Sequence, residues 1–448
     1  MKDIYSQILK QYWGYDDFRG IQRQIIESIG AGHDTLGLMP TGGGKSITFQ
    51  VPSMSMEGIC IVITPLIALM KDQVGHLKAR GIRAASLHTG MSHEQILTIL
   101  DNCVFGAYKF LYVSPERLAS DLFCQKLQHM QVNFICVDEA HCISQWGYDF
   151  RPSYLSIKNI RRILPGTPIL ALTATATSDV VKDIQKQLDF RQECVFRMSF
   201  ERPNLSYIVL NDYIKVEELY RILKSTSGST IIYTRSRRDC KELCEYIKNN
   251  GFSVTYYHAG LSNTEKDERQ KLWQEDQIRI MVATNAFGMG IDKPDVRQVI
   301  HMELPDSLEA YYQEAGRAGR DGKPAKAYLF YCDRDKTKLK KRISENYPEK
   351  EFIRTVYEHI CYFYQIAEGF GLGVRREFNI GEFCYNFRHY PVQVHSALCI
   401  LDKCGYIEYT DAEDGTSRVL FILKREELYL LNEQDCNSDT VIRAMLRL

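Results

Sequence analysis

Short apolar runs recur along the N-terminal part of the chain, separated by longer stretches in which apolar residues follow a helical spacing. The runs are TLGLMP, ICIVITP, AASLHTG, KFLYVSP, FICVDEA and PILALTATAT. Apolar runs of strand length that alternate with helix-length segments are typical of βαβ units, whose parallel sheet is covered on both faces. The pattern therefore predicts a parallel α/β domain over residues 1–200.

The same alternation begins again after FRMSFERPNLSY, with the runs STIIYTRS, SVTYYHAG, IRIMVATNAFGMG, QVIHMELP and AKAYLFY. We expect a second parallel α/β domain over residues 201–342, which ends in the basic run RDKTKLKKR (334–342). The two halves share little sequence similarity.

The pattern changes after residue 342. IRTVYEHICYFYQIAEGF, NIGEFCYNF and PVQVHSALCILDKCG indicate helices, and IEYT and SRVLFIL flank the turn DAEDG, which is typical of a hairpin. Helices followed by a two-stranded ribbon predict a small helical, winged-helix-like C-terminal domain over residues 343–448. The final SDTVIRAMLRL opens a helix that the end of the sequence cuts short, as in a truncated domain.

Composition and charge narrow the class of protein. The 448 residues are 45% apolar and 25% charged, an ordinary globular composition for two or three domains. Lys plus Arg (56) equals Asp plus Glu (56), but residues 343–448 hold 11 basic and 17 acidic side chains, so the positive excess lies in the first two domains. Those domains can accept a phosphate backbone, whereas the acidic C-terminal domain is better suited to a protein partner.

Nothing in the sequence indicates secretion or a membrane anchor. The longest apolar stretch, GICIVITPLIALM, is too short to span a bilayer, and the N-terminal MKDIYSQILKQYWGYDD has no apolar core of a signal peptide. The 14 cysteines fall within strand-like runs or at helical spacing, which is typical of reduced thiols. We expect an intracellular protein, in the cytoplasm or nucleoid (the nucleus in a eukaryote).

The clearest chemical motif is PTGGGKS (40–46), which lies between an apolar strand and a helix-compatible segment. Consecutive glycines let backbone N–H groups surround a phosphate chain at a helix N-terminus. We expect Lys45 to reach the β- and γ-phosphates and the Ser46 hydroxyl to bind Mg²⁺. The strict phosphate-loop pattern has glycine where this chain has Met39. A chance glycine-rich turn is the alternative.

Two carboxylates end the apolar run ICVDEAH (135–141). At the carboxyl edge of a parallel sheet, Asp138 would hold Mg²⁺, partly through water, and Glu139 would orient and deprotonate the attacking water. A solvated acidic loop is the alternative. An N-K-x-D motif is absent, which disfavours a GTPase.

The segment QEAGRAGRDG (313–322) supplies the cations that phosphate transfer needs. Arg317 and Arg320 are three residues apart and would share one face if the segment is helical. Because they belong to the second domain, they would reach a nucleotide on the first domain only across a cleft, so hydrolysis would depend on closure. Pairing of both arginines with surface acids is the alternative.

Taken together, these motifs resemble those of superfamily 2 helicases, and specifically the RecQ family, over about residues 12–332. YWGYDDFRGIQ (12–22) resembles the adenine-reading motif, TPLIALMKDQV motif Ia, TATAT motif III, SFERPNL motif IV, FGMGIDKPDVR motif V and QEAGRAGR motif VI. The resemblance implies two tandem RecA-like domains. It also implies an ATP site formed by Arg19, Gln22, Thr41, Gly42, Gly43, Gly44, Lys45, Ser46 and Asp292, with Gln313, Arg317 and Arg320 as catalytic residues.

The segment CISQWGYDFRPSY (142–154), directly after DEAH, is similar to the aromatic-rich loop of that family. Trp146 and Phe150 can stack on unpaired bases, and Arg151 can contact a phosphate or a base face. The alternative is that both aromatic rings belong to the core. Tyr148 stands where the family usually has histidine, so that side chain's role does not carry over.

The resemblance implies an ATP- and Mg²⁺-dependent DNA helicase with 3′→5′ polarity that acts on single-stranded and forked DNA. We expect a monomer that grips the strand near Pro65, Ser114 and Thr284. The family usually has a four-cysteine zinc module after the second domain, but no C-x₂-C spacing follows residue 333, so we expect no zinc site. The turn of the predicted hairpin is acidic, without an aromatic residue to wedge a base pair, so a part in strand separation is in doubt and protein contact is an alternative. Two other functions stay open: an ATPase that translocates or remodels RNA without unwinding DNA, and a non-catalytic nucleic-acid-binding scaffold.

Overall fold

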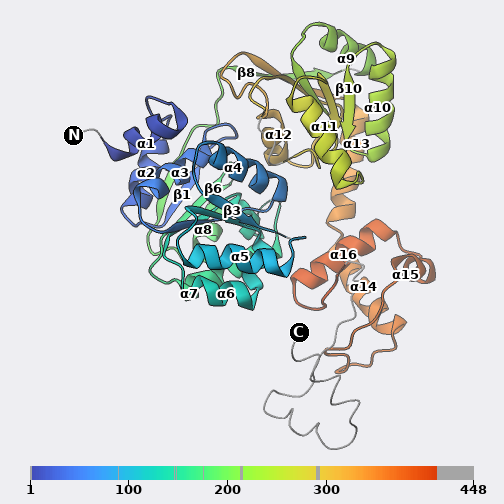
Figure 1. Cartoon of the computed structure of the whole chain (residues 1–448). Coiled ribbons are helices and arrows are strands. Elements are labelled where there is room, and N and C mark those ends of the chain that lie inside the picture. Colours follow the sequence, from blue (N-terminus) through green and yellow to red (C-terminus); the bar gives the residue numbers. More distant parts are fainter. Residues whose placement is uncertain are drawn as a thin grey trace, which may run out of the picture. The chain divides into compact units, whose positions relative to one another are not determined.

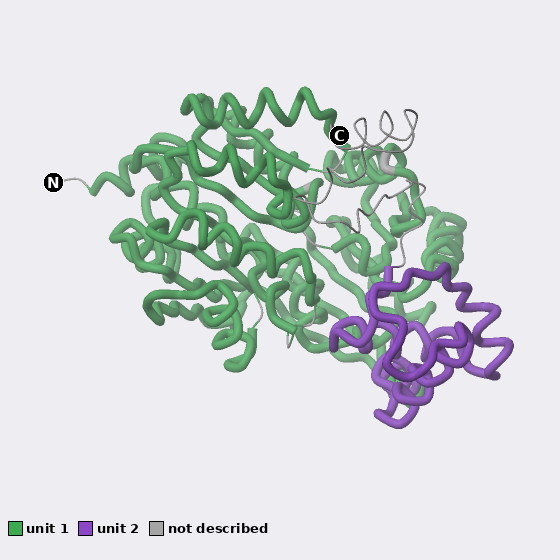
Figure 2. Tube along the Cα trace, turned by 90° about the horizontal axis from the view of Figure 1, so that it is seen from below, with its two compact units in different colours: residues 1–339 green, residues 340–448 purple. Residues whose placement is uncertain are grey.

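The computed structural model describes residues 3–88, 90–145, 147, 149–174, 176–211, 215–288 and 293–410. The chain divides into two compact units, residues 1–339 and 340–448, which Figure 2 shows in green and purple. The first unit contains both predicted α/β domains.

The first sheet has seven strands in the order β3-β4-β2-β5-β6-β1-β7. Every pairing is parallel. The strands are β1 (Thr35–Leu38), β2 (Ile59–Ile63), β3 (Ala84–Leu87), β4 (Phe110–Val113), β5 (Val132–Val137), β6 (Ile169–Thr173) and β7 (Cys194–Arg197).

Helices cover both faces of this sheet (Figure 1). Successive side chains of a strand point to opposite faces, so each strand contributes to two cores. In β2, Ile61 packs into the core on one face and Val62 into the core on the other. The first core is completed by α5 (His93–Val104), α6 (Asp121–Leu127), α7 (Ile157–Ile163) and α8 (Ser178–Gln187). The second core is completed by α2 (Gln22–Gly30), α3 (Lys45–Ser55) and α4 (Ile67–Ala79), and α1 (Ile4–Trp13) packs against α3. Short 3₁₀ helices lie at Pro115–Ala119, Ala140–Ile143 and Pro152–Ser156.

The second sheet has six strands in the order β10-β11-β9-β12-β13-β8, again with every pairing parallel. Its strands are β8 (Leu205–Asn211), β9 (Ser229–Tyr233), β10 (Val254–Tyr257), β11 (Ile280–Ala283), β12 (Val296–His301) and β13 (Ala325–Tyr331). One face packs against α9 (Lys215–Lys224) and α10 (Arg237–Asn249). The other face packs against α11 (Asn263–Gln274) and α12 (Leu308–Ala315), and α13 (Asp333–Asn346) follows β13.

The second unit is helical over its described part. It contains α14 (Lys350–Phe363), α15 (Ile380–Phe387) and α16 (Pro391–Lys403), whose buried residues include Val356, Phe383 and Leu398. The predicted hairpin falls mainly on residues 411–448, which lie outside the described residues.

The predicted fold class is confirmed: two tandem parallel-sheet domains of the RecA-like type precede a helical region. The finer boundaries at residues 200 and 342 stay predictions. Among the described helices, none combines the length and the apolar character that crossing a membrane requires.

Candidate functional site

The candidate site lies at the carboxyl edge of the first sheet. β1 leads into residues 40–44 and then α3, and β5 leads into Asp138 and Glu139. β6 lies between β1 and β5, so the two segments meet at the same edge.

The loop before α3 has the shape of an anion cradle. Gly42 and Gly44 have φ angles of 80° and 76°, in the left-handed region that favours glycine. The Gly43 N–H donates to the Pro40 carbonyl at 2.9 Å, which closes the turn directly before the N-terminus of α3. That N-terminus provides free N–H groups and a partial positive charge.

The first residue of α2 braces this loop. The Gln22 side-chain amide donates to the Gly44 carbonyl at 3.1 Å and to the Gly43 carbonyl at 3.3 Å, while its oxygen accepts from the Arg19 N–H at 2.8 Å. Gln22 is thus fully engaged with the backbone of the loop, and the Arg19 guanidinium lies over the Tyr15 ring at 5.6 Å from its centre.

Lys45, Asp138 and Glu139 form a buried charged group. The Lys45 ammonium lies 3.2 Å from Oε1 of Glu139, and both side chains are largely shielded, with 17% and 11% of their surface exposed. Glu139 has a left-handed backbone (φ 48°), and its N–H donates to Oδ1 of Asp138 at 3.0 Å. The Tyr154 hydroxyl donates to the Asp138 carbonyl at 3.0 Å, which fixes the turn.

The two carboxyl groups differ in pKa because their surroundings differ. Burial, together with the neighbouring Glu139, raises the pKa of Asp138 to about 6, against the pull of Lys45. Burial also acts to raise the pKa of Glu139, but the Lys45 ammonium outweighs it and leaves that pKa below its usual value. Burial disfavours the charged form of Lys45, yet Glu139 and Asp138 hold its pKa above the ordinary value. Glu139 is therefore the more acidic carboxyl group of the pair, and its ionised form can accept a proton.

The two arginines of the second domain reach this group. They lie in the turns that follow α12, which ends at Ala315, and not on one face of a helix. A cleft of about 390 Å³ is lined by the phosphate loop, by both carboxylates and by Gln313, Arg317 and Arg320. Arg317 is buried, with 2% of its surface exposed. A methyl group on Gly42 would lie 3.0 Å from Cγ of Arg320, so that arginine packs directly against the loop.

The donor set fits a nucleoside triphosphate and Mg²⁺. Backbone N–H groups of the cradle, Lys45 and the arginines suit phosphate oxygens, while the Ser46 hydroxyl and the Asp138 carboxylate suit a hard cation that keeps several waters. Trp13 at the end of α1 and Tyr15 between α1 and α2 also line the cleft. The sequence prediction missed them, although they belong to the aromatic segment YWGYDDFRGIQ that it singled out.

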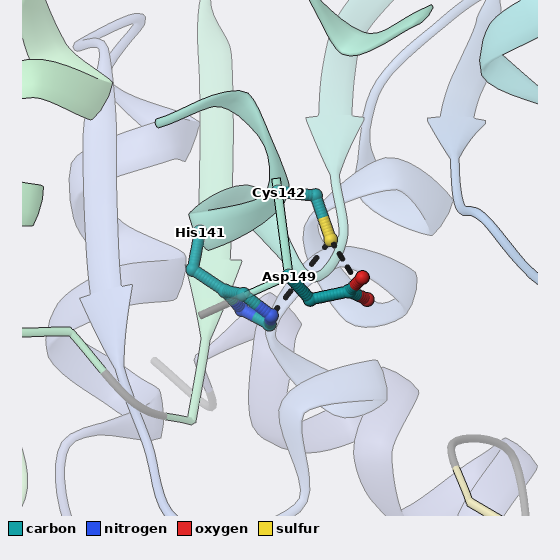
Figure 3. A group of neighbouring side chains, drawn as sticks. All are labelled: His141, Cys142 and Asp149. Atoms are coloured by element: carbon teal, nitrogen blue, oxygen red, sulfur yellow. Dashed lines mark hydrogen bonds between the residues drawn. The ribbon is translucent and has the colours of Figure 1, made fainter. Parts of the chain in front are cut away.

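Three side chains that follow the acidic pair in the sequence lie close together (Figure 3). His141, Cys142 and Asp149 place one potential ligand atom each within 4.8 Å of one another. Sγ of Cys142 lies 3.7 Å from Nε2 of His141 and 3.8 Å from Oδ2 of Asp149. Burial raises the pKa of the Cys142 thiol, and the Arg151 guanidinium donates to the same Asp149 oxygen at 3.0 and 3.2 Å. We interpret the group as a hydrogen-bonded connection rather than a metal centre, because Arg151 already neutralises the carboxylate.

His141 also lies beside the acidic pair. Nδ1 of His141 lies 3.5 Å from Oε2 of Glu139, and the Arg151 N–H donates to the Cys142 carbonyl at 2.9 Å. Phe150 is half-buried, and Trp146 lies outside the described residues, so whether Trp146 is core or functional stays open.

The predicted strand-gripping residues also lie at carboxyl edges. Pro65 and Ser114 follow the neighbouring strands β2 and β4, and Thr284 follows β11 in the second sheet. The buried hydroxyls of Ser114 and of Thr64 have no hydrogen-bond partner within the described ranges of the chain. Such hydroxyls are available to a ligand, and Thr64, next to Pro65, is a residue that the sequence prediction missed.

Most of the residues predicted to bind the nucleotide thus line one cleft. Its lining includes Arg19, Gln22, Thr41, Gly42, Gly44, Lys45, Ser46, Asp138, Glu139, Gln313, Arg317 and Arg320. Gly43 joins them through its hydrogen bond with Gln22, and Asp292 lies outside the described residues. The roles assigned to these residues stay predictions.

The chain is similar to known families and proteins. A "DEAD/DEAH box helicase" family model matches residues 19–184, and a "Helicase conserved C-terminal domain" model matches residues 214–322. The chain is 42% identical over 346 residues to "ATP-dependent DNA helicase RecQ" of Pasteurella multocida, covering 77% of this chain and 55% of that protein. It is 40% identical over 335 residues to "Probable ATP-dependent DNA helicase RecS" of Bacillus subtilis, covering 74% of this chain and 67% of that protein. The chain spans about half the length of several of the relatives it matches.

Solved structures share the fold. Mycobacterium smegmatis helicase Lhr bound to ssDNA and AMP-PNP matches with a TM-score of 0.60 at 18% identity, over 72% of this chain and 47% of that one. Helicase MrfA bound to DNA matches with a TM-score of 0.63 at 16% identity, over 76% of this chain and 52% of that one.

Proposed function

The chain belongs to the RecQ family of helicases, and from that premise we propose that it is an ATP-dependent DNA helicase. Hydrolysis of Mg-ATP in the cleft would drive movement along single-stranded DNA and separation of a forked duplex. The proposed direction, 3′→5′, rests on the family. We also propose that the protein acts as a monomer inside the cell and that its acidic C-terminal unit binds a protein partner.

One observation carries the proposal: Arg317 and Arg320 of the second domain line the same cleft as Lys45, Asp138 and Glu139 of the first domain. A phosphate loop alone accelerates hydrolysis little, and a cation on the developing charge adds about 10³–10⁵ in rate. Since the two arginines and the phosphate loop belong to different domains, turnover requires that the two domains stay together at the nucleotide.

Each group of residues in the cleft has a separate proposed role. The cradle and Lys45 bind the phosphates, and Ser46 and Asp138 hold the cation, which neutralises phosphate charge when bound. Glu139, ionised at neutral pH, orients a water molecule and takes its proton. Gln313 and the arginines complete the site from the second domain.

The proposed strand contacts are Pro65, Ser114 and Thr284, together with Trp146, Phe150 and Arg151 of the aromatic-rich loop. Contacts to the backbone of the strand would be independent of sequence and would weaken as salt increases. The hydrogen bonds that join His141, Cys142, Asp149 and Arg151, together with the position of His141 3.5 Å from Glu139, support a link between strand occupancy and hydrolysis.

Steady-state ATP hydrolysis, with and without single-stranded DNA, tests the proposal together with unwinding of 3′-tailed and 5′-tailed duplexes. We expect hydrolysis that single-stranded DNA stimulates and unwinding of the 3′-tailed duplex only. Lys45→Ala should abolish both activities, while the matched control Lys10→Ala, which removes an exposed lysine paired with Asp16, should retain both. Stimulated hydrolysis without unwinding would favour a translocase or RNA remodeller, and absence of hydrolysis would favour a binding scaffold.

A further inference from the structure

A group of buried polar side chains lies behind Arg317 in the second domain. Tyr233 ends β9, His301 ends the neighbouring strand β12, and Glu314 lies in the last turn of α12. Tyr233 and His301 are direct partners in the strand register. Their exposed fractions are 4% and 1%, and that of Glu314 is 9%, so none of the three is a surface residue.

His301 is fixed on two sides. Its Nε2 lies 2.8 Å from Oε2 of Glu314, and its ring stacks on the Tyr233 ring at 5.2 Å between centres with an angle of 21°. A carboxylate only accepts hydrogen bonds, so Nε2 carries the proton and donates it. Nδ1 of His301 has no hydrogen-bond partner in the part of the chain that the structure describes. The imidazole therefore contacts both the Tyr233 ring and the Glu314 carboxylate and fixes their relative position.

The Tyr233 hydroxyl then connects two different segments. It donates to the Phe287 carbonyl at 2.8 Å, and the nearby Arg317 guanidinium acts to lower its pKa against the effect of burial. A hydroxyl has one proton and two lone pairs, so it can donate to the carbonyl and accept from the guanidinium at the same time. Burial raises the pKa of Tyr233, which keeps the hydroxyl protonated for this double role.

Each of these segments belongs to a different part of the proposed mechanism. The Phe287 N–H donates to the Thr284 carbonyl at 2.9 Å, so Phe287 closes the turn that carries the proposed strand contact. Arg317 lines the nucleotide cleft, and its charge helps to lower the pKa of Glu139. Nε of Arg317 has no hydrogen-bond partner among the described residues, so the guanidinium keeps a donor for a ligand.

We propose that Tyr233 is a positioning residue that sets the Arg317 guanidinium according to the position of the turn at residues 284–287, and that His301 with Glu314 holds Tyr233 in place. Binding of a DNA strand at that turn would thus change the position of Arg317 through the Tyr233 hydroxyl. The inference rests on the proposed function, because it assigns the coupling between strand binding and hydrolysis to specific side chains.

Tyr233→Phe tests it, since this change removes the hydroxyl and keeps the ring that stacks on His301. We expect kcat of DNA-stimulated ATP hydrolysis to fall at least ten-fold, while KM for ATP and Kd for single-stranded DNA stay within two-fold of wild type. The matched control is Tyr328→Phe, a buried tyrosine of β13 that packs on the other face of the same sheet and should leave kcat unchanged. Wild-type kcat in Tyr233→Phe would overturn the proposal.

A second pair of variants keeps the test decisive if Tyr233→Phe lowers the melting temperature. His301→Gln keeps an N–H that can donate to Glu314, whereas His301→Ala does not. We expect His301→Gln to retain several-fold more DNA-stimulated kcat than His301→Ala, and equal kcat in both would also overturn the proposal. If the wild-type chain itself shows no DNA-stimulated hydrolysis, the proposed function fails instead.

Discussion

The contact between Lys45 and Glu139 makes a quantitative prediction about nucleotide binding. In the structure the lysine that should meet the phosphates is bound to the carboxylate that should activate water. A triphosphate must therefore draw the Lys45 ammonium away from Glu139. Replacing Glu139 by glutamine removes this competition and also removes a negative charge from beside the phosphates.

The size of the effect follows from the geometry. Opposite unit charges 3.2 Å apart attract by about 5 kcal/mol at an effective dielectric constant of about 20. The loss of hydration that both ions suffer in the buried cleft offsets most of that attraction. We expect a net gain of about 1–2 kcal/mol in nucleotide binding, which corresponds to a dissociation constant roughly five- to thirty-fold lower.

The assay is equilibrium binding of a non-hydrolysable ATP analogue in the presence of Mg²⁺, with steady-state hydrolysis measured in parallel. Glu139→Gln should bind the analogue more tightly and lose about 10²–10⁴ in kcat, because the general base is gone. Glu27→Gln is the matched control, since Glu27 pairs with Arg23 at an exposed position of the same domain. Weaker binding in Glu139→Gln, or hydrolysis at the wild-type rate, would refute the reasoning.

Three further predictions concern other parts of the molecule. Gly44→Ala should raise KM for ATP and cost about 1–2 kcal/mol of stability, since alanine disfavours a φ of 76° and its methyl group would meet the Gln22 amide; an unchanged KM and melting temperature would contradict this. Trp146→Ala and Phe150→Ala should weaken DNA stimulation of hydrolysis and leave nucleotide binding nearly intact, whereas loss of thermal stability alone would assign the rings to the core. Burial, helped by His359, lowers the pKa of His389 in the folded C-terminal unit, so the unfolded chain binds more protons as the pH falls below about 6.5. Calorimetry should then show a melting temperature that falls between pH 7.5 and 5.5 more in wild type than in His389→Asn, and equal falls would contradict that assignment.

The fold was accessible to sequence reasoning because buried parallel strands leave a strong pattern. Runs such as ICIVITP and FICVDEA are apolar throughout, since both faces of β2 and β5 are covered by helices. Each run also ends at the carboxyl edge of the sheet, which is why Asp138 and Glu139 could be placed at that edge from the sequence.

The connections between site residues could not be predicted in the same way. Gln22 hydrogen-bonds to the loop backbone at Gly43 and Gly44, and no motif spacing encodes a side-chain bond across twenty residues. Tyr233 and His301 are separated by a long stretch of chain and meet only through the register of β9 and β12. In the sequence both look like ordinary residues at the ends of strands, so their role becomes visible only once the strands are paired.

The central claim is that the cations of the second domain act on a nucleotide held by the first. The most direct measurement is a crystal structure of the chain with Mg²⁺, ADP, aluminium fluoride and single-stranded DNA. The account predicts that guanidinium nitrogens of Arg317 and Arg320 lie about 3 Å from the fluoride or the β-phosphate oxygens, within hydrogen-bond distance. A structure in which both guanidinium groups face bulk solvent while the phosphate loop holds the nucleotide would contradict it.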